Sequence, residues 1–103
     1  MFDNFFAYVE KAKETTIYDS NVLLAKFLDI PPNRISQWKI NRSYVSPTDC
    51  ILLAKLLGIS VEEIAFVSRA QEAKIPDEKK KWLSLAAEYA RPVNPPDKYK
   101  KHK

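Results

Sequence analysis

Residues 21–38 read Asn-Val-Leu-Leu-Ala-Lys-Phe-Leu-Asp-Ile-Pro-Pro-Asn-Arg-Ile-Ser-Gln-Trp, and this stretch decides the fold. Leu24, Ala25 and Leu28 lie three and four residues apart, so they share one face of a helix. Two consecutive prolines then interrupt that helix, because proline cannot continue the backbone hydrogen-bond ladder and disfavours helix in the residue before it.

A second short helix is predicted after the prolines. Ile35 and Trp38 are spaced to face the first helix, and Ala25 is small enough to let the two helices cross closely. Such a pair is a helix-turn-helix, here at about residues 21–40, and its usual use is to lay the second helix in the major groove of DNA. We assign its core to Leu24, Ala25, Leu28, Ile30, Ile35 and Trp38.

These residues resemble the Cro/CI-type helix-turn-helix proteins of the lambda-repressor-like family, small regulators encoded by phages and prophages. The resemblance rests on that core with Ser36, and on Pro47 and residues 53–60, and it covers about residues 15–66. It implies an all-α fold, a five-helix bundle, extended here by a C-terminal helix and a basic tail. The family usually has glycine where this chain has Asp29, at a turn with φ > 0 that Asp also tolerates.

Composition and spacing divide the chain into three parts. We expect a DNA-binding domain over residues 1–75, a C-terminal helix over 76–90 and a basic tail rich in proline and lysine over 91–103. Within the first part, an apolar stripe predicts a helix of roughly residues 3–15 that backs the helix pair. Its members are Phe2, Phe5, Phe6, Val9 and Ala12.

Capping residues mark the helices that follow the pair. Ser46 and Pro47 open the next helix, and Gly58 ends it. Ser60 and Glu63 are spaced as a capping box, in which each side chain bonds the backbone N–H of the other residue. We therefore predict a further helix from about residue 61 to residue 74.

The second helix of the pair carries polar residues where a DNA-reading helix would need them. Asn and Gln can bond N6 and N7 of adenine, and Arg can bond O6 and N7 of guanine. The resemblance implies base contacts at Asn33 and Gln37, with Arg34 and Ser36 on the flanks reading a base or a phosphate. The alternative is that all four are ordinary solvated side chains on an exposed helix.

The surroundings of that helix supply candidate phosphate contacts. Ser20 is the expected N-cap of the first helix, and exposed amides beside it can hold a phosphate oxygen with help from the helix dipole. The loop after the second helix is basic, and such loops hold phosphates and fix the register on DNA. Capping alone would equally explain Ser20, and Lys26 could simply be solvated. The full set of candidate phosphate contacts is Ser20, Asn21, Lys26, Lys39, Arg42, Ser43 and Tyr44.

The C-terminal helix, opened by Asp77, goes beyond the smallest members of the family. Its apolar face could pack on its own domain or against the same helix of a second subunit. We favour a homodimer, because the resemblance implies that use and because palindromic operators match two-fold symmetry. From Arg91 onward, we expect a mobile or loosely docked segment that makes no core. The candidate dimer residues are Trp82, Leu83, Leu85, Ala86 and Tyr89.

Charge and composition narrow the classes of function. The 103 residues carry a net charge of +4, with +3 over residues 20–46 and +4 over residues 75–103, so a polyanion is the natural partner. The apolar runs are too short for a bilayer, and the start lacks the pattern of a signal peptide, which predicts no membrane association. The single cysteine, Cys50, excludes an internal disulfide and fits the cytoplasm of a bacterial host.

Catalysis is not expected, because the sequence has no Ser/His or Cys/His set, no metal-ligand cluster and no glycine-rich loop. Its one histidine, His102, lies in the tail. No metal, cofactor or small-molecule ligand is predicted. We expect a sequence-specific transcriptional regulator, a phage or prophage repressor or Cro-like switch on double-stranded DNA. The alternative is a module with the same fold that acts on a protein partner, such as an antitoxin or antirepressor.

Overall fold

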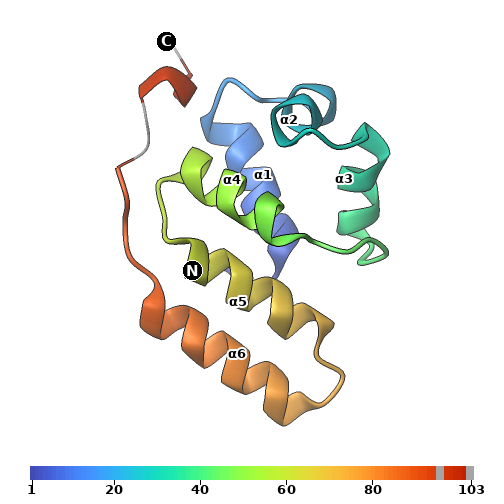
Figure 1. Cartoon of the computed structure of the whole chain (residues 1–103), viewed down its shortest axis with the longest axis vertical. Coiled ribbons are helices and arrows are strands. Elements are labelled where there is room, and N and C mark those ends of the chain that lie inside the picture. The colour runs from blue at the N-terminus through green and yellow to red at the C-terminus, as the bar shows by residue number, and fades with distance from the viewer. Residues whose placement is uncertain (95–96, 102–103) are drawn as a thin grey trace.

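The computed structural model describes residues 1–94 and 97–101, and these residues are helical apart from their connections. The all-α prediction is therefore confirmed, and the described parts contain no sheet beyond two isolated bridges. In Figure 1, α1 and α4 lie in the middle, α2 and α3 on one side, and α5 and α6 on the other. The elements are α1 (Phe5–Thr15), α2 (Asn21–Leu28), α3 (Pro32–Lys39), α4 (Pro47–Leu57), α5 (Val61–Glu72), α6 (Pro76–Tyr89) and a 3-10 turn at Asp97–Tyr99.

Helix α1 supplies the centre of the core, although it begins later than predicted. The Asn4 side chain caps it by accepting from the N–H of Ala7 at 2.9 Å. Phe2 therefore precedes the helix, remains 40% exposed and packs edge-on against the buried Tyr8, so the predicted aromatic stripe is wrong at that position. Phe5 is fully buried and meets the Trp38 ring edge-on, with 5.1 Å between ring centroids.

The two helices α2 and α3 close on each other through an apolar contact. Asp29 ends α2 in the left-handed region at φ 58°, the conformation that the sequence required there. Pro32 is the first residue of α3, where its missing N–H leaves no partner unsatisfied. Of the assigned core residues, Ile30 is half-buried, and the buried ones are Leu24, Ala25, Leu28, Ile35 and Trp38.

Helix α4 has a capping box that holds its first turn. The Ser46 hydroxyl accepts from the N–H of Asp49 at 3.1 Å, and the Asp49 carboxylate accepts from the N–H of Ser46 at 3.0 Å. Gly58 then ends the helix with φ 69°, a left-handed turn that only glycine adopts without a Cβ clash. Both predicted ends of α4 are confirmed.

The capping box predicted at the start of α5 is wrong. The Ser60 hydroxyl instead donates to the carbonyl of Tyr89 at 2.9 Å, and the Glu63 carboxylate accepts from the Tyr8 hydroxyl at 2.6 Å. Both side chains are buried, and there each finds a partner from a distant part of the chain. The two side chains therefore bond distant parts of the chain instead of forming the local capping box.

Helix α6 returns alongside α5 and packs on it within the same chain (Figure 1). It begins at Pro76 with Ile75 as N-cap, so the assignment of Asp77 as the cap is wrong by two residues. Ala86 is fully buried, and the Trp82 ring lies 5.6 Å from that of Phe66. Part of the apolar face of α6 is thus used inside the monomer, and a homodimer stays a prediction.

The segment after α6 docks on the body of the protein. The N–H of Val93 donates to the carbonyl of Gly58 at 2.7 Å, and that of Ile17 donates to the carbonyl of Tyr99 at 3.0 Å. Tyr99 is only 6% exposed and packs against Phe27, with 5.4 Å between ring centroids. The expectation that the segment from Arg91 onward makes no core is therefore wrong at Tyr99, which belongs to the core. The predicted tail positions His102 and Lys103 lie outside the described residues.

Candidate nucleic-acid interface

Helix α3 turns one face to the core and a polar face to solvent. Ile35 and Trp38 point inward and are buried, and this leaves Asn33, Ser36 and Gln37 exposed. Residues 33, 36 and 37 share a face, because they lie three and four positions apart along the helix. Arg34 is half-buried at the edge of that face. The arrangement presents two amide side chains one turn apart, as a major-groove contact would require.

The chain leaves α3 through a tight left-handed stop. Asn41 has φ 57°, a left-handed conformation that asparagine tolerates, and its N–H donates to the carbonyl of Trp38 at 3.1 Å. The N–H of Arg42 donates to the carbonyl of Gln37 at 2.9 Å. These two bonds fix the direction of the loop that follows α3. Its candidate phosphate contacts are the half-buried Ser43 and the exposed Lys39, Arg42 and Tyr44.

The start of α2 forms the other border of this surface. The Ser20 hydroxyl accepts from the N–H of Leu23 at 3.1 Å, which confirms Ser20 as the N-cap. The side-chain oxygen of Asn21 accepts from the ammonium of Lys13 at 2.8 Å. Lys26 is exposed on the same helix. A cation of α1 therefore lies at the first turn of α2, where the helix dipole also favours an anion.

Lys13 was missed by sequence reasoning, and so was Gln71. The amide nitrogen of Gln71 donates to the side-chain oxygen of Asn41 at 2.8 Å, and its oxygen accepts from the N–H of Phe5 at 2.9 Å. Gln71 thus ties α5 to the start of α1 and to the turn after α3. No local spacing signals either residue, since both depend on how α1 and α5 pack against the helix pair.

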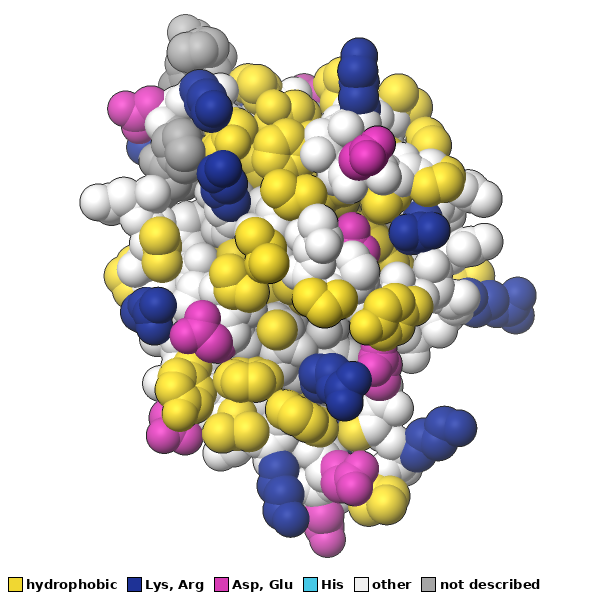
Figure 2. Space-filling view, in the orientation of Figure 1, with side chains coloured by type: hydrophobic (Ala, Val, Ile, Leu, Met, Phe, Trp, Pro, Cys, Tyr) yellow, Lys and Arg dark blue, Asp and Glu magenta, His cyan; other side chains and the backbone are white. Residues whose placement is uncertain are grey.

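The cations beside α3 are not neutralised by carboxylates in the described parts of the chain. The ion pairs in these parts join Arg69 to Glu72, Arg91 to Glu62 and Lys100 to Asp97, and none of them includes a residue of α2, α3 or the loop after α3. In Figure 2, basic side chains project on the side of the molecule that carries α3 and its following loop. This surface is therefore positive as well as polar, and it suits a polyanion. The unpaired cations are Lys26, Arg34, Lys39 and Arg42.

Two further observations concern metal binding and the cysteine thiol in the described residues. They contain no group of three or more His, Cys, Asp or Glu side chains placed to hold a metal ion. Burial raises the pKa of the Cys50 thiol to about 11, so this side chain remains a neutral thiol at ordinary pH.

Within residues 1–94 and 97–101, no helix combines the length and the apolar character that crossing a bilayer demands.

The family comparison bears directly on the pair α2–α3. Residues 20–64 match the family model HTH_3, described as helix-turn-helix. Residues 20–64 form a helix-turn-helix domain. The span has the lambda-repressor-like fold, and the proteins that this model describes are DNA-binding regulators that are typically non-enzymatic. Comparisons with curated proteins and with solved structures gave no match.

The matched span runs from the N-cap of α2 into the first turn of α5. It therefore contains the whole polar face of α3 and the basic loop after it. Helix α1, helix α6 and the docked C-terminal segment lie outside the span, as do Lys13 and Gln71. The helix-turn-helix domain is thus supported on several sides by parts of the chain that the family model does not include.

Proposed function

We propose that the protein is a sequence-specific transcriptional regulator that lays α3 in the major groove of double-stranded DNA. The observation that carries this proposal is the exposed face of α3, where Asn33 and Gln37 stand one turn apart inside a helix-turn-helix domain. The unpaired cations on either side of that face supply the attraction that brings DNA to it. A phage or prophage repressor or a Cro-like switch is the kind of regulator that we infer.

The contacts divide into two classes in this proposal. Asn33 and Gln37 read base edges, and Arg34 and Ser36 read a base or a phosphate from the flanks. The basic loop and the first turn of α2 hold the sugar-phosphate backbone and set the register. The phosphate contacts are Ser20, Asn21, Lys26, Lys39, Arg42, Ser43 and Tyr44. Lys13 belongs with them through its bond to Asn21.

We also propose a homodimer on a palindromic operator. A two-fold symmetric pair would place two copies of α3 on half-sites about one helical turn, or roughly 34 Å, apart. In this arrangement residues 1–75 act as the DNA-binding domain, and the exposed remainder of α6 is available for the second subunit. Two-fold symmetry would also double the number of phosphate contacts and steepen the dependence of affinity on salt.

The experiment begins with selection of bound fragments from genomic DNA, which yields an operator and its symmetry. Fluorescence anisotropy then compares Gln37→Ala with wild type on the operator and on random DNA. We expect Gln37→Ala to lose about 1–3 kcal/mol of preference for the operator per lost base contact. Arg42→Ala should weaken binding to both DNAs alike and reduce the salt slope by about 1.

Lys80→Ala is the matched control, because Lys80 is an exposed cation on α6, outside the helix-turn-helix domain. It should leave the preference for the operator unchanged. Equal discrimination by wild type and Gln37→Ala would reject the role of Gln37. Absence of any selected fragment, with the protein folded, would reject the regulator.

A second candidate is a module that acts on a protein partner, as an antitoxin or antirepressor does. The favouring observation is the hydrophobic surface over α5 and α6 in Figure 2. At opposite ends of α6, Ile75 is 56% exposed and Tyr89 is 45% exposed. Exposed apolar patches of this kind mark interaction sites. Isolation of a stable complex between this chain and another protein would favour this candidate over the first, provided that the complex does not bind DNA.

A further inference from the structure

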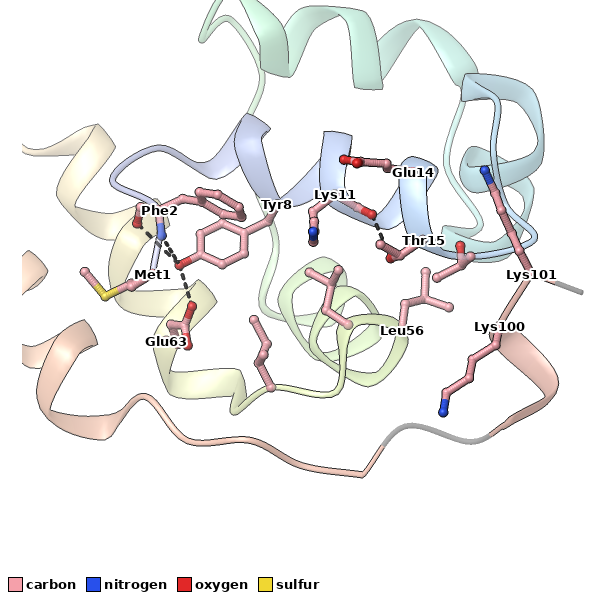
Figure 3. A pocket seen from close by; sticks show the side chains of 13 residues that line it. Met1, Phe2, Tyr8, Lys11, Glu14, Thr15, Leu56, Glu63, Lys100 and Lys101 are labelled. Carbon is pink, nitrogen blue, oxygen red and sulfur yellow. Dashed lines mark hydrogen bonds between the residues drawn. The ribbon is translucent and has the colours of Figure 1, made fainter. Parts of the chain in front are cut away.

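A pocket of about 830 Å³ opens between α1, the end of α4 and the docked C-terminal segment (Figure 3). It lies outside the surface built by α2 and α3. Pockets that take small organic ligands have volumes of this order. The residues that line it, among those described, come from both ends of the chain and from the turn between α4 and α5.

The pocket combines an apolar floor with three lysine side chains, whose ammonium groups lie apart from one another in Figure 3. Leu56, Leu57 and Ile59 contribute aliphatic side chains from the end of α4 and the turn after it. Lys100 and Lys101, from the C-terminal segment, lie at one end in Figure 3, and Lys11 from α1 lies between that end and Tyr8. A ligand that fills this space therefore meets hydrocarbon along its length and positive charge at one end.

At the opposite end of the pocket, the Tyr8 hydroxyl is held by hydrogen bonds within the protein. The Tyr8 hydroxyl donates to Glu63 at 2.6 Å, and it accepts from the N–H of Phe2 at 3.2 Å (Figure 3). Burial and the bond to Glu63 raise the pKa of Tyr8 far above its ordinary value, so its proton stays in place. The Glu63 carboxylate carries negative charge there, and it repels an anion toward the lysine end.

The lysine end keeps a surplus of positive charge. Lys100 pairs with Asp97 at 3.3 Å, but both side chains are well exposed, and such a pair is weak. Neither Lys11 nor Lys101 has a carboxylate within ion-pair distance among the described residues. Among the described residues that line the pocket, the two carboxylates are Glu14 and Glu63. Three ammonium groups thus stand against two carboxylates outside the Tyr8 end, Glu14 and the Asp97 partner of Lys100.

We propose that this pocket binds a medium-chain aliphatic carboxylate, with its chain on the α4 floor and its head group among the lysines. The ligand's chain removes the exposed apolar surface of Leu57 and Ile59 from water, which supplies affinity in proportion to its length. The head group gains a charge-assisted hydrogen bond from a lysine ammonium group and longer-range attraction from the others. The site goes beyond the DNA-binding function and does not depend on it.

Calorimetric titration of the full chain with octanoate at low ionic strength tests the site. We expect saturable binding of one octanoate per chain. Butanoate, which keeps the charge but loses most of the chain, should bind at least about tenfold more weakly. Octyltrimethylammonium, which keeps the chain but reverses the charge, should not bind in the same range of concentration.

The double variant Lys11→Glu/Lys101→Glu locates the head group. Both lysines are exposed, so the reversal leaves the core intact, and circular dichroism verifies the fold. We expect octanoate affinity to fall at least about tenfold. Lys80→Glu, which reverses one charge on α6, is the control. Its affinity for octanoate should remain within about twofold of that of the wild type.

Equal affinity for octanoate and the octyl cation would overturn the proposal, because it would mean nonspecific adsorption of the chain. Absence of saturation, or a double variant indistinguishable from Lys80→Glu, would overturn it as well. None of these measurements contains DNA. Failure of the pocket proposal therefore leaves the regulator proposal standing, and failure of operator binding leaves the pocket standing.

Discussion

The docked C-terminal segment allows a sharp test, because one aromatic side chain anchors it. Tyr99 is 6% exposed and contacts two rings, Phe27 at 5.4 Å and Tyr18 at 6.1 Å between centroids. Truncation of a large buried aromatic to alanine costs about 3–5 kcal/mol, and each aromatic pair contributes about 0.5–1.5 kcal/mol of that. Tyr99 lies at the edge of the core, where the site can collapse, so we expect Tyr99→Ala to lose about 3 kcal/mol.

Urea denaturation followed by circular dichroism measures this loss as a change in the free energy of unfolding. For a chain of this size, about 3 kcal/mol corresponds to a fall in Tm of at least about 12 °C. Tyr44→Ala is the matched control, because the Tyr44 side chain is 63% exposed. A surface substitution of that kind should change the free energy of unfolding by no more than about 0.5 kcal/mol.

Equal effects of Tyr99→Ala and Tyr44→Ala would refute the reasoning, since the Tyr99 ring would then contribute no packing. A lowered slope of the denaturation curve in Tyr99→Ala would point instead to loss of two-state behaviour, and would require a second probe.

Three further predictions follow from the caps, the turns and the buried thiol. Asp49→Ala removes half of the capping box with Ser46 and should cost about 1–2 kcal/mol of unfolding free energy, against no measurable change for the exposed neighbour Thr48→Ala. Asp29→Ala should destabilise the protein by about 1 kcal/mol more than Asp29→Gly does, because alanine resists φ 58° and glycine does not; equal thermal midpoints would contradict this. The pKa of Cys50 is raised from 9.0 to about 11, so the unfolded thiol ionises first and stability should fall by up to about 2 kcal/mol between pH 9 and pH 11. Denaturant curves of Cys50→Ala should lack that component, and an identical pH profile in both proteins would rule it out.

The pair α2–α3 was predictable from the sequence because its determinants are local. Leu24 and Leu28 set one helical face, two prolines set the break, and Ile35 with Trp38 set the second face. The outward direction of Asn33 and Gln37 follows from the same spacing, once the inward residues are known. Periodicity and chain-breaking residues were therefore sufficient for this part.

The start of α5 was not predictable in the same way. Ser60 and Glu63 match a capping box in spacing and chemistry, yet each bonds a group that lies far away in the sequence. A local motif shows which hydrogen bonds a side chain could form, but the partners available in the folded protein determine which one it forms. Gln71 was missed for the related reason that its bonds to Asn41 and Phe5 require knowledge of the tertiary packing.

The packing of Tyr99 was missed because the composition of the surrounding sequence does not predict a buried residue. Prolines and lysines dominate the segment from Arg91 onward, and that composition is typical of chains without a core of their own. A segment need not build a core to enter one. A single aromatic ring and a few backbone hydrogen bonds suffice when the rest of the protein offers a complementary surface.

The same contact has a consequence for synthesis in the cell. Because the ring that covers Phe27 and Tyr18 comes from Tyr99, these two aromatics stay uncovered on the ribosome until Tyr99 has emerged. The helix-turn-helix is translated early but is completed late. A product truncated just before Tyr99 would therefore contain every residue of α2 and α3, but Phe27 and Tyr18 would stay open to aggregation and proteolysis.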